Sequence, residues 1–220
     1  MPAPLAAIAL PAGTSAGPLL PDAIPRMPVV PSLIAINVLL FFLQGSRGDL
    51  MLFALWPIEA GFLPWQLVTS AFLHGSLTHL AFNMFGLWTF GRELESLLGA
   101  LRFLTLYFAS VVTAAVVQLV FVAIAGSHSY TLGASGGVFG LLLAWAAFFP
   151  ESEIVPIFPP IPIRARVFAA IYAVIELVLG VTGTAQGVAH FAHLGGMLGA
   201  WLLIRRWEWR AREARRRRLG

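Results

Sequence analysis

The chain has 220 residues, of which 59% are hydrophobic and 11% are charged, and its mean hydropathy is +0.84. This composition is too apolar for an ordinary soluble domain, so we expect an integral membrane protein. The formal net charge is +4 with no lysine present, and the absence of cysteine excludes disulfide bonds and thiolate chemistry.

The N-terminal segment is rich in proline, alanine and glycine. No basic residue precedes its short apolar stretch, Ile8-Ala9-Leu10, so the segment does not fit a cleaved signal peptide. We expect residues 1–27 to form a disordered cytoplasmic tail.

Six nearly uncharged apolar runs follow and predict membrane helices. They cover residues 29–43, 77–90, 101–125, 132–149, 167–181 and 191–204. About 20 residues cross a typical hydrocarbon core, so the shorter runs imply local thinning of the bilayer or a water-filled recess. The predicted fold is an all-α membrane protein, with a six-helix transmembrane domain at residues 28–207 and an Arg-rich cytoplasmic tail at residues 208–220.

Residues 49–71, between the first two runs, are rich in Trp and Phe and carry few charges. Trp56 and Trp65 suit the headgroup level of a bilayer, so we expect a partly helical, re-entrant segment. The alternative is a broken seventh span. Pro57, Gly61 and Pro64 argue against it.

The arginines predict the orientation. In a six-span topology only Arg47 falls on one side, and the others fall on the opposite side: Arg26, Arg92, Arg102, Arg164, Arg166 and the eight arginines between positions 205 and 218. The positive-inside rule then places both termini in the cytoplasm. We expect a multi-pass protein of the cell (inner) membrane. We interpret the arginine-dense end as a topology anchor on anionic lipid rather than a nucleic-acid site.

Ser135 stands at the start of the fourth run, within Gly133-Ala134-Ser135-Gly136. A serine hydroxyl needs a base to become a nucleophile, and an unpaired hydroxyl is costly in hydrocarbon. Glycines line the fourth and sixth runs and would let the two helices approach closely: Gly133, Gly136, Gly137 and Gly140 in one, and Gly195, Gly196 and Gly199 in the other. The alternative is that these glycines only pack helices and that Ser135 bonds to its own backbone.

Two histidines, three residues apart, compete for the role of base. The positions three and seven residues after His193 are the small Gly196 and Ala200, whereas those after His190 are bulky. His193 therefore lies on the face of the sixth run that can approach the fourth run closely. We expect His190 to be a solvated cap at the mouth of the helix.

His79 and Asn83 lie four residues apart and share one helical face. Polar residues in membrane spans usually face the protein interior, so these two could donate to a developing oxyanion together with the Ser135 N–H. The alternative is a structural hydrogen-bond network between spans that includes His74.

A metal site at His74, His79, His190 and His193 is a weaker hypothesis. Zinc sites usually add a carboxylate or thiolate, and the sequence predicts none near that depth except Asp49 and Glu59, so we predict no metal. Glu176, in the middle of the fifth run, is a candidate functional residue because it is an intramembrane carboxylate. The sequence assigns Glu176 no specific role.

Three motifs together resemble the rhomboid family of intramembrane serine proteases. They are His79-x-x-x-Asn83, Gly133-Ala134-Ser135-Gly136 and Ala192-His193-Leu194-Gly195-Gly196, and His74, Glu95 and Gly99 match further family positions. The resemblance extends over nearly all of the chain from the first run to the sixth. It implies a six-helix bundle whose residues 49–71 form a membrane-embedded first loop.

For the chemistry, the resemblance implies an endopeptidase that cleaves transmembrane segments of membrane proteins without a cofactor. The implied roles are Ser135 as nucleophile, His193 as general base and acid, His79 and Asn83 as oxyanion donors, and Gly133, Gly136, Phe139 and Gly196 in support. Two alternatives stay open. One is a non-proteolytic rhomboid-like protein that binds client transmembrane helices, and the other is a channel or transporter, which inverted repeats would support.

The chain departs from the family pattern at three positions. Gln66 follows Trp65 where the family has arginine, so an arginine contact that would brace the loop is absent. Phe139 replaces a tyrosine and could still stack on His193 without donating a hydrogen bond. Ala200 replaces a glycine. None of the three removes the chemistry.

Overall fold

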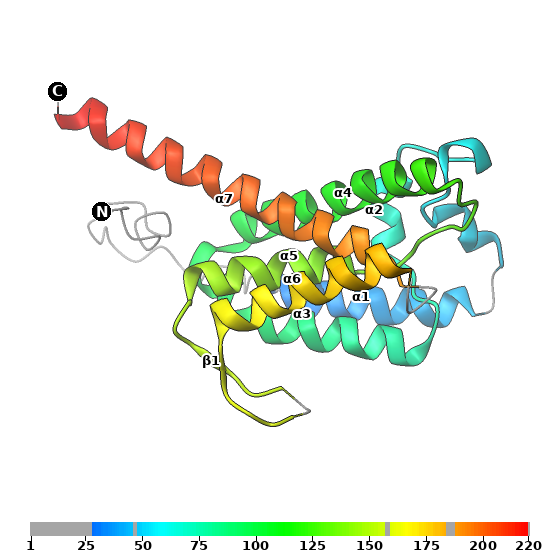
Figure 1. Cartoon of the computed structure of the whole chain (residues 1–220), viewed down its shortest axis with the longest axis horizontal. Coiled ribbons are helices and arrows are strands. Elements are labelled where there is room, and N and C mark those ends of the chain that lie inside the picture. Colours follow the sequence, from blue (N-terminus) through cyan, green and yellow to red (C-terminus); the bar gives the residue numbers. More distant parts are fainter. Residues whose placement is uncertain (1–27, 46–47, 157–158, 184–187, 220) are drawn as a thin grey trace, which may run out of the picture.

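The computed structural model describes residues 28–45, 48–156, 159–183 and 188–219, so the predicted tail at residues 1–27 lies outside the described residues. Within this part of the chain, six helices of 14 to 30 residues pack into a bundle (Figure 1). They are α1 (Val29–Gln44), α3 (Leu77–Leu98), α4 (Ala100–Ala125), α5 (Ser135–Phe148), α6 (Ala165–Thr182) and α7 (His190–Leu219). Each predicted run is therefore helical.

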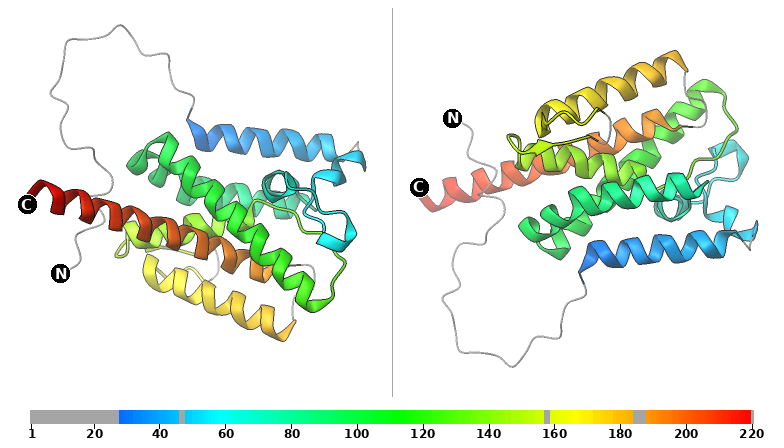
Figure 2. Two further views of the ribbon diagram at one scale, coloured as in Figure 1. Left: turned by 90° about the horizontal axis from the view of Figure 1, so that it is seen from above. Right: turned by 90° about the horizontal axis from the view of Figure 1, so that it is seen from below.

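Helix α7 packs most extensively against α4 and α5, and α5 also packs against α3 and α6, so α5 lies at the centre of the bundle. Helix α1 packs on α3, and α6 packs on α5 and α7. Figure 2 shows the consequence, with α1 and α6 on opposite edges of the bundle. Helices α3, α5 and α7 begin at the same end, which brings the candidate site residues near the start of each to one level (Figure 1).

Short elements fill the connection between α1 and α3. They are η2 (Gly48–Phe53), η3 (Ile58–Ala60), α2 (Gln66–Thr69) and η4 (Ser70–Phe72), so the partly helical character predicted for residues 49–71 is confirmed. A two-residue hairpin between α5 and α6, β1 (Glu153–Ile154) with β2 (Ile163–Arg164), is a small departure from an all-α fold.

Gln66 braces this first loop. Its side chain is buried, its Oε1 accepts from the N–H groups of Trp56 at 3.1 Å and Leu63 at 3.2 Å, and its Nε2 donates to the Leu52 carbonyl at 2.9 Å. An amide can both donate and accept, so one neutral side chain ties three points of the loop together. No arginine stands at this position, as the sequence shows, and the Gln66 amide braces the loop in its place.

Helix α3 does not end at its polar segment as predicted but continues to Leu98. The reason is that the carboxylates there have partners. Glu95 accepts from the N–H groups of Val29 at 2.6 Å and Val30 at 2.9 Å, at the start of α1. Glu93 accepts from the Trp145 indole N–H at 2.6 Å. Helix α7 likewise continues past residue 204 and projects beyond the bundle (Figure 1).

Replacing Glu95 by alanine should destabilise the fold. The Pro28 that precedes α1 supplies no side-chain cap, so the Glu95 carboxylate satisfies free N–H groups at the positive end of that helix. Losing it should cost about 1 to 2 kcal/mol of the free energy of unfolding. Thermal unfolding in detergent measures this loss, with Glu59→Ala at an exposed carboxylate as the control. Equal unfolding temperatures for the two variants would contradict the assignment.

The surface of the bundle is strongly apolar. Helix α6 buries only three of its residues, Ala165, Ala169 and Glu176, while Val174 and Val181 are 60% and 72% exposed. Phe42, Phe82 and Ile124 are also mostly exposed. Among the described helices, α4 and α6 are long and apolar enough to cross a membrane by length and composition, and α1 and α5 are shorter apolar helices.

Candidate active site

Ser135 and His193 meet at the shared end of the bundle. Ser135 is the first residue of α5 and His193 lies in the first turn of α7. The serine Oγ is 2.8 Å from Nε2 of the imidazole, which is buried. When Nε2 is unprotonated, the serine O–H donates to it, which is the arrangement of a hydroxyl nucleophile with its base.

Glycines allow this approach. A Cβ on Gly196 would collide with the backbone carbonyl of Gly136, so the backbones of α5 and α7 touch at the residue after Ser135 and one turn after His193. Gly195 and Gly199 face α4 instead, where a Cβ would meet Val117 and Thr113. The glycines of α7 therefore do not form one stripe against α5 as predicted, because α7 lies in the groove between α4 and α5.

Phe139 holds the imidazole from one side. Its ring stacks on His193 with 4.2 Å between ring centroids and an interplanar angle of 5°. Phe139 follows Ser135 by one helical turn, so both lie on the face of α5 that meets α7. The predicted stacking is confirmed.

His79 and Asn83 enter from α3. The His79 ring lies against Gly133, where a Cβ would come within 2.8 Å of its Nε2, and Gly133 has a φ of 127°, which favours glycine. Asn83 is buried, and its Nδ2 donates to the His79 carbonyl at 2.9 Å. One of the two amide hydrogens of Asn83 is thereby used within its own helix.

His74 packs behind His79, with 5.1 Å between ring centroids. The His74 ring is buried, and neither ring nitrogen has a hydrogen-bond partner among the described residues. Burial lowers the pKa of His74 to about 4, and the neighbouring His79 contributes to the same shift. The imidazole is therefore neutral at neutral pH, and its backbone is held by the Gln44 amide.

His190 is not the solvated cap that the sequence predicts. It is 6% exposed, and its Nδ1 lies 2.6 Å from Glu176 Oε2 on α6. The same oxygen lies 2.9 Å from Nδ1 of His193. Sequence reasoning missed this contact. The available signal was a lone carboxylate in an apolar run together with a second histidine of unassigned role.

The predicted alternative of four converging histidines is not what the described residues form. Their one cluster of possible metal ligands is Glu176, His190 and His193. Two ligands of a tetrahedral zinc ion lie about 3.4 Å apart, given bond lengths near 2.1 Å. The separation of 2.6 Å between His190 and Glu176 fits a hydrogen bond better.

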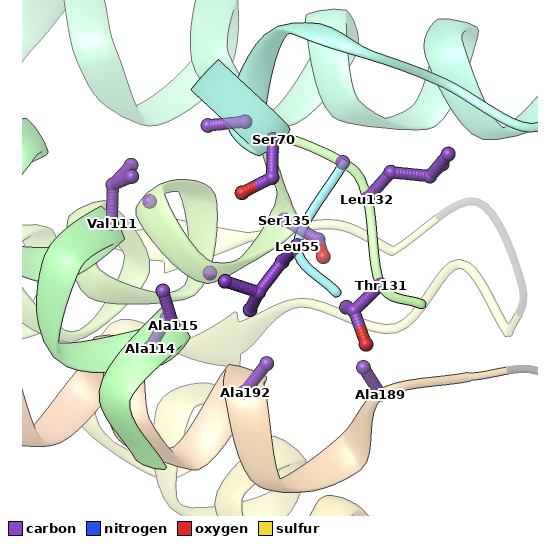
Figure 3. A pocket seen from close by; sticks show the side chains of 14 residues that line it. Leu55, Ser70, Val111, Ala114, Ala115, Thr131, Leu132, Ser135, Ala189 and Ala192 are labelled. Carbon is purple, nitrogen blue, oxygen red and sulfur yellow. The ribbon is translucent and has the colours of Figure 1, made fainter. Parts of the chain in front are cut away.

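A small cavity opens beside Ser135. Figure 3 shows the side chains of Ser135, Leu55, Thr131 and Ala192 around it. Most of the lining residues are small, and the space has room for about two water molecules. Leu55 and Thr131 exchange backbone hydrogen bonds of 2.8 and 2.9 Å, which tie the first loop to the segment before α5.

The Rhomboid domain model matches residues 62–206, about two thirds of the chain, including Ser135 and His193. The chain belongs to the rhomboid family. This assignment agrees with the resemblance carried by the three motifs.

Individual rhomboid relatives agree with this assignment. The chain is 36% identical over 151 residues to presenilin-associated rhomboid-like protein A, mitochondrial, of Danio rerio, covering 67% of this chain and 39% of that protein. It is 30% identical over 176 residues to rhomboid protease GluP of Bacillus subtilis (strain 168), covering 76% of this chain and 32% of the relative. Rhomboid protein 1, mitochondrial, of Saccharomyces cerevisiae (strain ATCC 204508 / S288c) is 34% identical over 145 residues, 60% of this chain and 39% of that protein. The chain thus spans about two fifths or less of the length of these relatives.

Proposed function

We propose that this rhomboid protein is an intramembrane serine endopeptidase that cleaves transmembrane segments with Ser135 and His193. The observation that carries the proposal is the 2.8 Å contact between Ser135 Oγ and His193 Nε2. A buried imidazole stacked on Phe139 and aimed at a serine at a helix start is poised to remove a proton. The name of the Bacillus subtilis relative, a rhomboid protease, supports the same activity.

The apolar surface supports a location within the bilayer. Apolar side chains are exposed along the helices, and a water-soluble protein rarely leaves so large an apolar area uncovered. We propose that all six long helices span the membrane and that the first loop is embedded in it. Arg102, Arg164 and Arg166 lie in a connection or in the first turn of a helix at the end opposite the site, and Arg92 lies within the last two turns of α3 toward the same end. This placement supports a cytoplasmic location for that end and for both termini. For a bacterial chain this membrane is the inner membrane.

The proposed reaction begins when His193 takes the Ser135 proton and the serine oxygen attacks the substrate carbonyl carbon. The resulting oxyanion is stabilised by the N–H of Ser135, by His79 and by the second amide hydrogen of Asn83. The first N–H groups of α5 suit this role because no side chain caps that helix. His193 then gives its proton to the leaving amine. A water, deprotonated by His193, hydrolyses the acyl-enzyme.

The cavity beside Ser135 supports a preference among substrates. An intact helix hides its carbonyls in hydrogen bonds, so the substrate must unwind locally, and helix-breaking residues near the outer face should favour cleavage. A cavity with room for about two water molecules accepts only a small side chain next to the cleaved bond. None of these steps requires a metal, a nucleotide or an organic cofactor.

Cleavage in proteoliposomes tests the proposal. The purified chain and a single-span substrate with an Ala/Gly-rich outer segment are reconstituted together, and the products are identified by mass spectrometry. We expect one main cut after a small residue, no cut with Ser135→Ala, and slower cleavage when leucines replace the Ala/Gly segment. Binding of the substrate without cleavage by the unmodified protein would favour the client-binding alternative.

A further inference from the structure

Glu176 is the one charged residue of α6 that the bundle buries. Its carboxylate reaches across to α7, where a single oxygen, Oε2, lies 2.6 Å from His190 Nδ1 and 2.9 Å from His193 Nδ1. Three side chains that the sequence leaves separate are therefore one buried polar group. The Ser135 contact is made through the opposite nitrogen of the same His193 ring.

The carboxylate decides where the proton of the neutral His193 ring sits. An ionised carboxylate only accepts hydrogen bonds. The tautomer of His193 with its proton on Nδ1, facing Oε2, is therefore favoured over the tautomer with a lone pair on Nδ1. The N–H direction is not in line with that oxygen, and Nδ1 has no other hydrogen-bond partner among the described residues. The two atoms are nonetheless 2.9 Å apart, which is within hydrogen-bonding distance. With the proton on Nδ1, Nε2 keeps the lone pair that the serine O–H needs.

We propose that Glu176 is a positioning residue that fixes the tautomer and orientation of His193, extending the expected Ser135–His193 pair into a serine–histidine–glutamate triad. The carboxylate also faces the imidazolium that forms when His193 takes the serine proton. This proposal rests on the proposed function, because it concerns the same reaction.

His190 has the supporting part in this arrangement. It donates to the carboxylate from one helical turn before His193, and at 2.6 Å it restrains the oxygen between the two rings. The ionisable groups that face His193 are then Glu176 from α6, His190 from its own helix and His79 from α3. On the side of α7 that faces α4, Gly195 and Gly199 lie against Thr113, Ala114 and Val117. These three residues carry no charge.

The test compares Glu176→Gln, which keeps the shape and removes the charge, with Glu176→Asp, which keeps the charge and shortens the reach. The matched control is Glu93→Gln, the same chemical change at a carboxylate that accepts from Trp145. Glu93 lies in the C-terminal half of α3, away from the site. Labelling of Ser135 by a fluorophosphonate probe should slow at least about tenfold in Glu176→Gln, less in Glu176→Asp and not at all in Glu93→Gln. In the cleavage assay kcat should fall and KM should stay the same, because Glu176 does not touch the substrate.

Nitrogen NMR of protein labelled with ¹⁵N in the histidine rings gives a readout that a merely structural role would not move. We expect His193, assigned by its loss in His193→Ala, to be protonated at Nδ1 in the unmodified protein and in Glu93→Gln, and to lose this preference in Glu176→Gln. An unchanged tautomer and labelling rate in folded Glu176→Gln would overturn the inference. Absence of labelling in the unmodified protein would instead count against the proposed function.

Discussion

Labelling of the detergent-purified protein with a fluorophosphonate probe should be lost completely in Ser135→Ala and should slow about a hundredfold or more in His193→Ala. The probe bonds only to an activated serine oxygen, and the 2.8 Å contact with Nε2 supplies the activation. Ser135→Ala removes the atom that reacts. His193→Ala leaves the hydroxyl but removes the group that takes its proton. The rate of labelling, followed by gel fluorescence, measures both effects.

His190→Ala is the matched control for the choice of base. It removes an imidazole one turn from His193 on the same helix, but its Nδ1 contacts Glu176 rather than the serine. Labelling should therefore persist at a reduced rate. Labelling that survives in His193→Ala and disappears in His190→Ala would show that the base is His190 and not His193.

Adding one methyl group at Gly196 should be among the most damaging small changes in this protein. Its Cβ would collide with the Gly136 carbonyl, and both are backbone positions in packed helices, so α5 and α7 would have to move apart. Overpacking of this kind costs about 1 to 3 kcal/mol or more. A displacement of about 1 Å between Ser135 and His193 is enough to lower the rate about a hundredfold. Gly196→Ala should therefore lower both the unfolding temperature and the rate of probe labelling.

Gly45→Ala provides the comparison for Gly196→Ala, because it adds the same methyl group where the nearest atom is a carbonyl 3.7 Å away and φ is −61°. Unfolding and labelling should then match those of the unmodified protein. If Gly196→Ala also matched, the close approach of α5 and α7 would not be what positions the site.

The helical runs and their main polar residues were predictable because these signals are local. An apolar run predicts a helix and most of its ends to within a few residues, although α3 and α7 continue further than predicted. The first and third predicted runs, for example, differ from α1 and α4 by one residue. The end of α3 was predicted too early because Glu95 looks like a polar boundary in sequence, and its partners lie at the start of α1, 65 and 66 residues away.

The choice of His193 over His190 was also local, since the small residues that follow it on one face of α7 are visible in the sequence. The structure places its Nε2 beside Ser135, while the roles of both residues stay predictions. The role of Gln66 was not local. A loop with a missing arginine looks unbraced until its three backbone partners are known.

The sequence by itself determined the membership in the rhomboid family, the helical runs and the candidate pair of Ser135 and His193, because periodicity, small residues and motif spacing express what each helix presents. Only the tertiary structure decided that Glu176 lies between His190 and His193, and that Gly195 and Gly199 face α4 while Gly196 faces α5. The physical reason is that the rotation of each helix about its axis is decided by packing against all of its neighbours together.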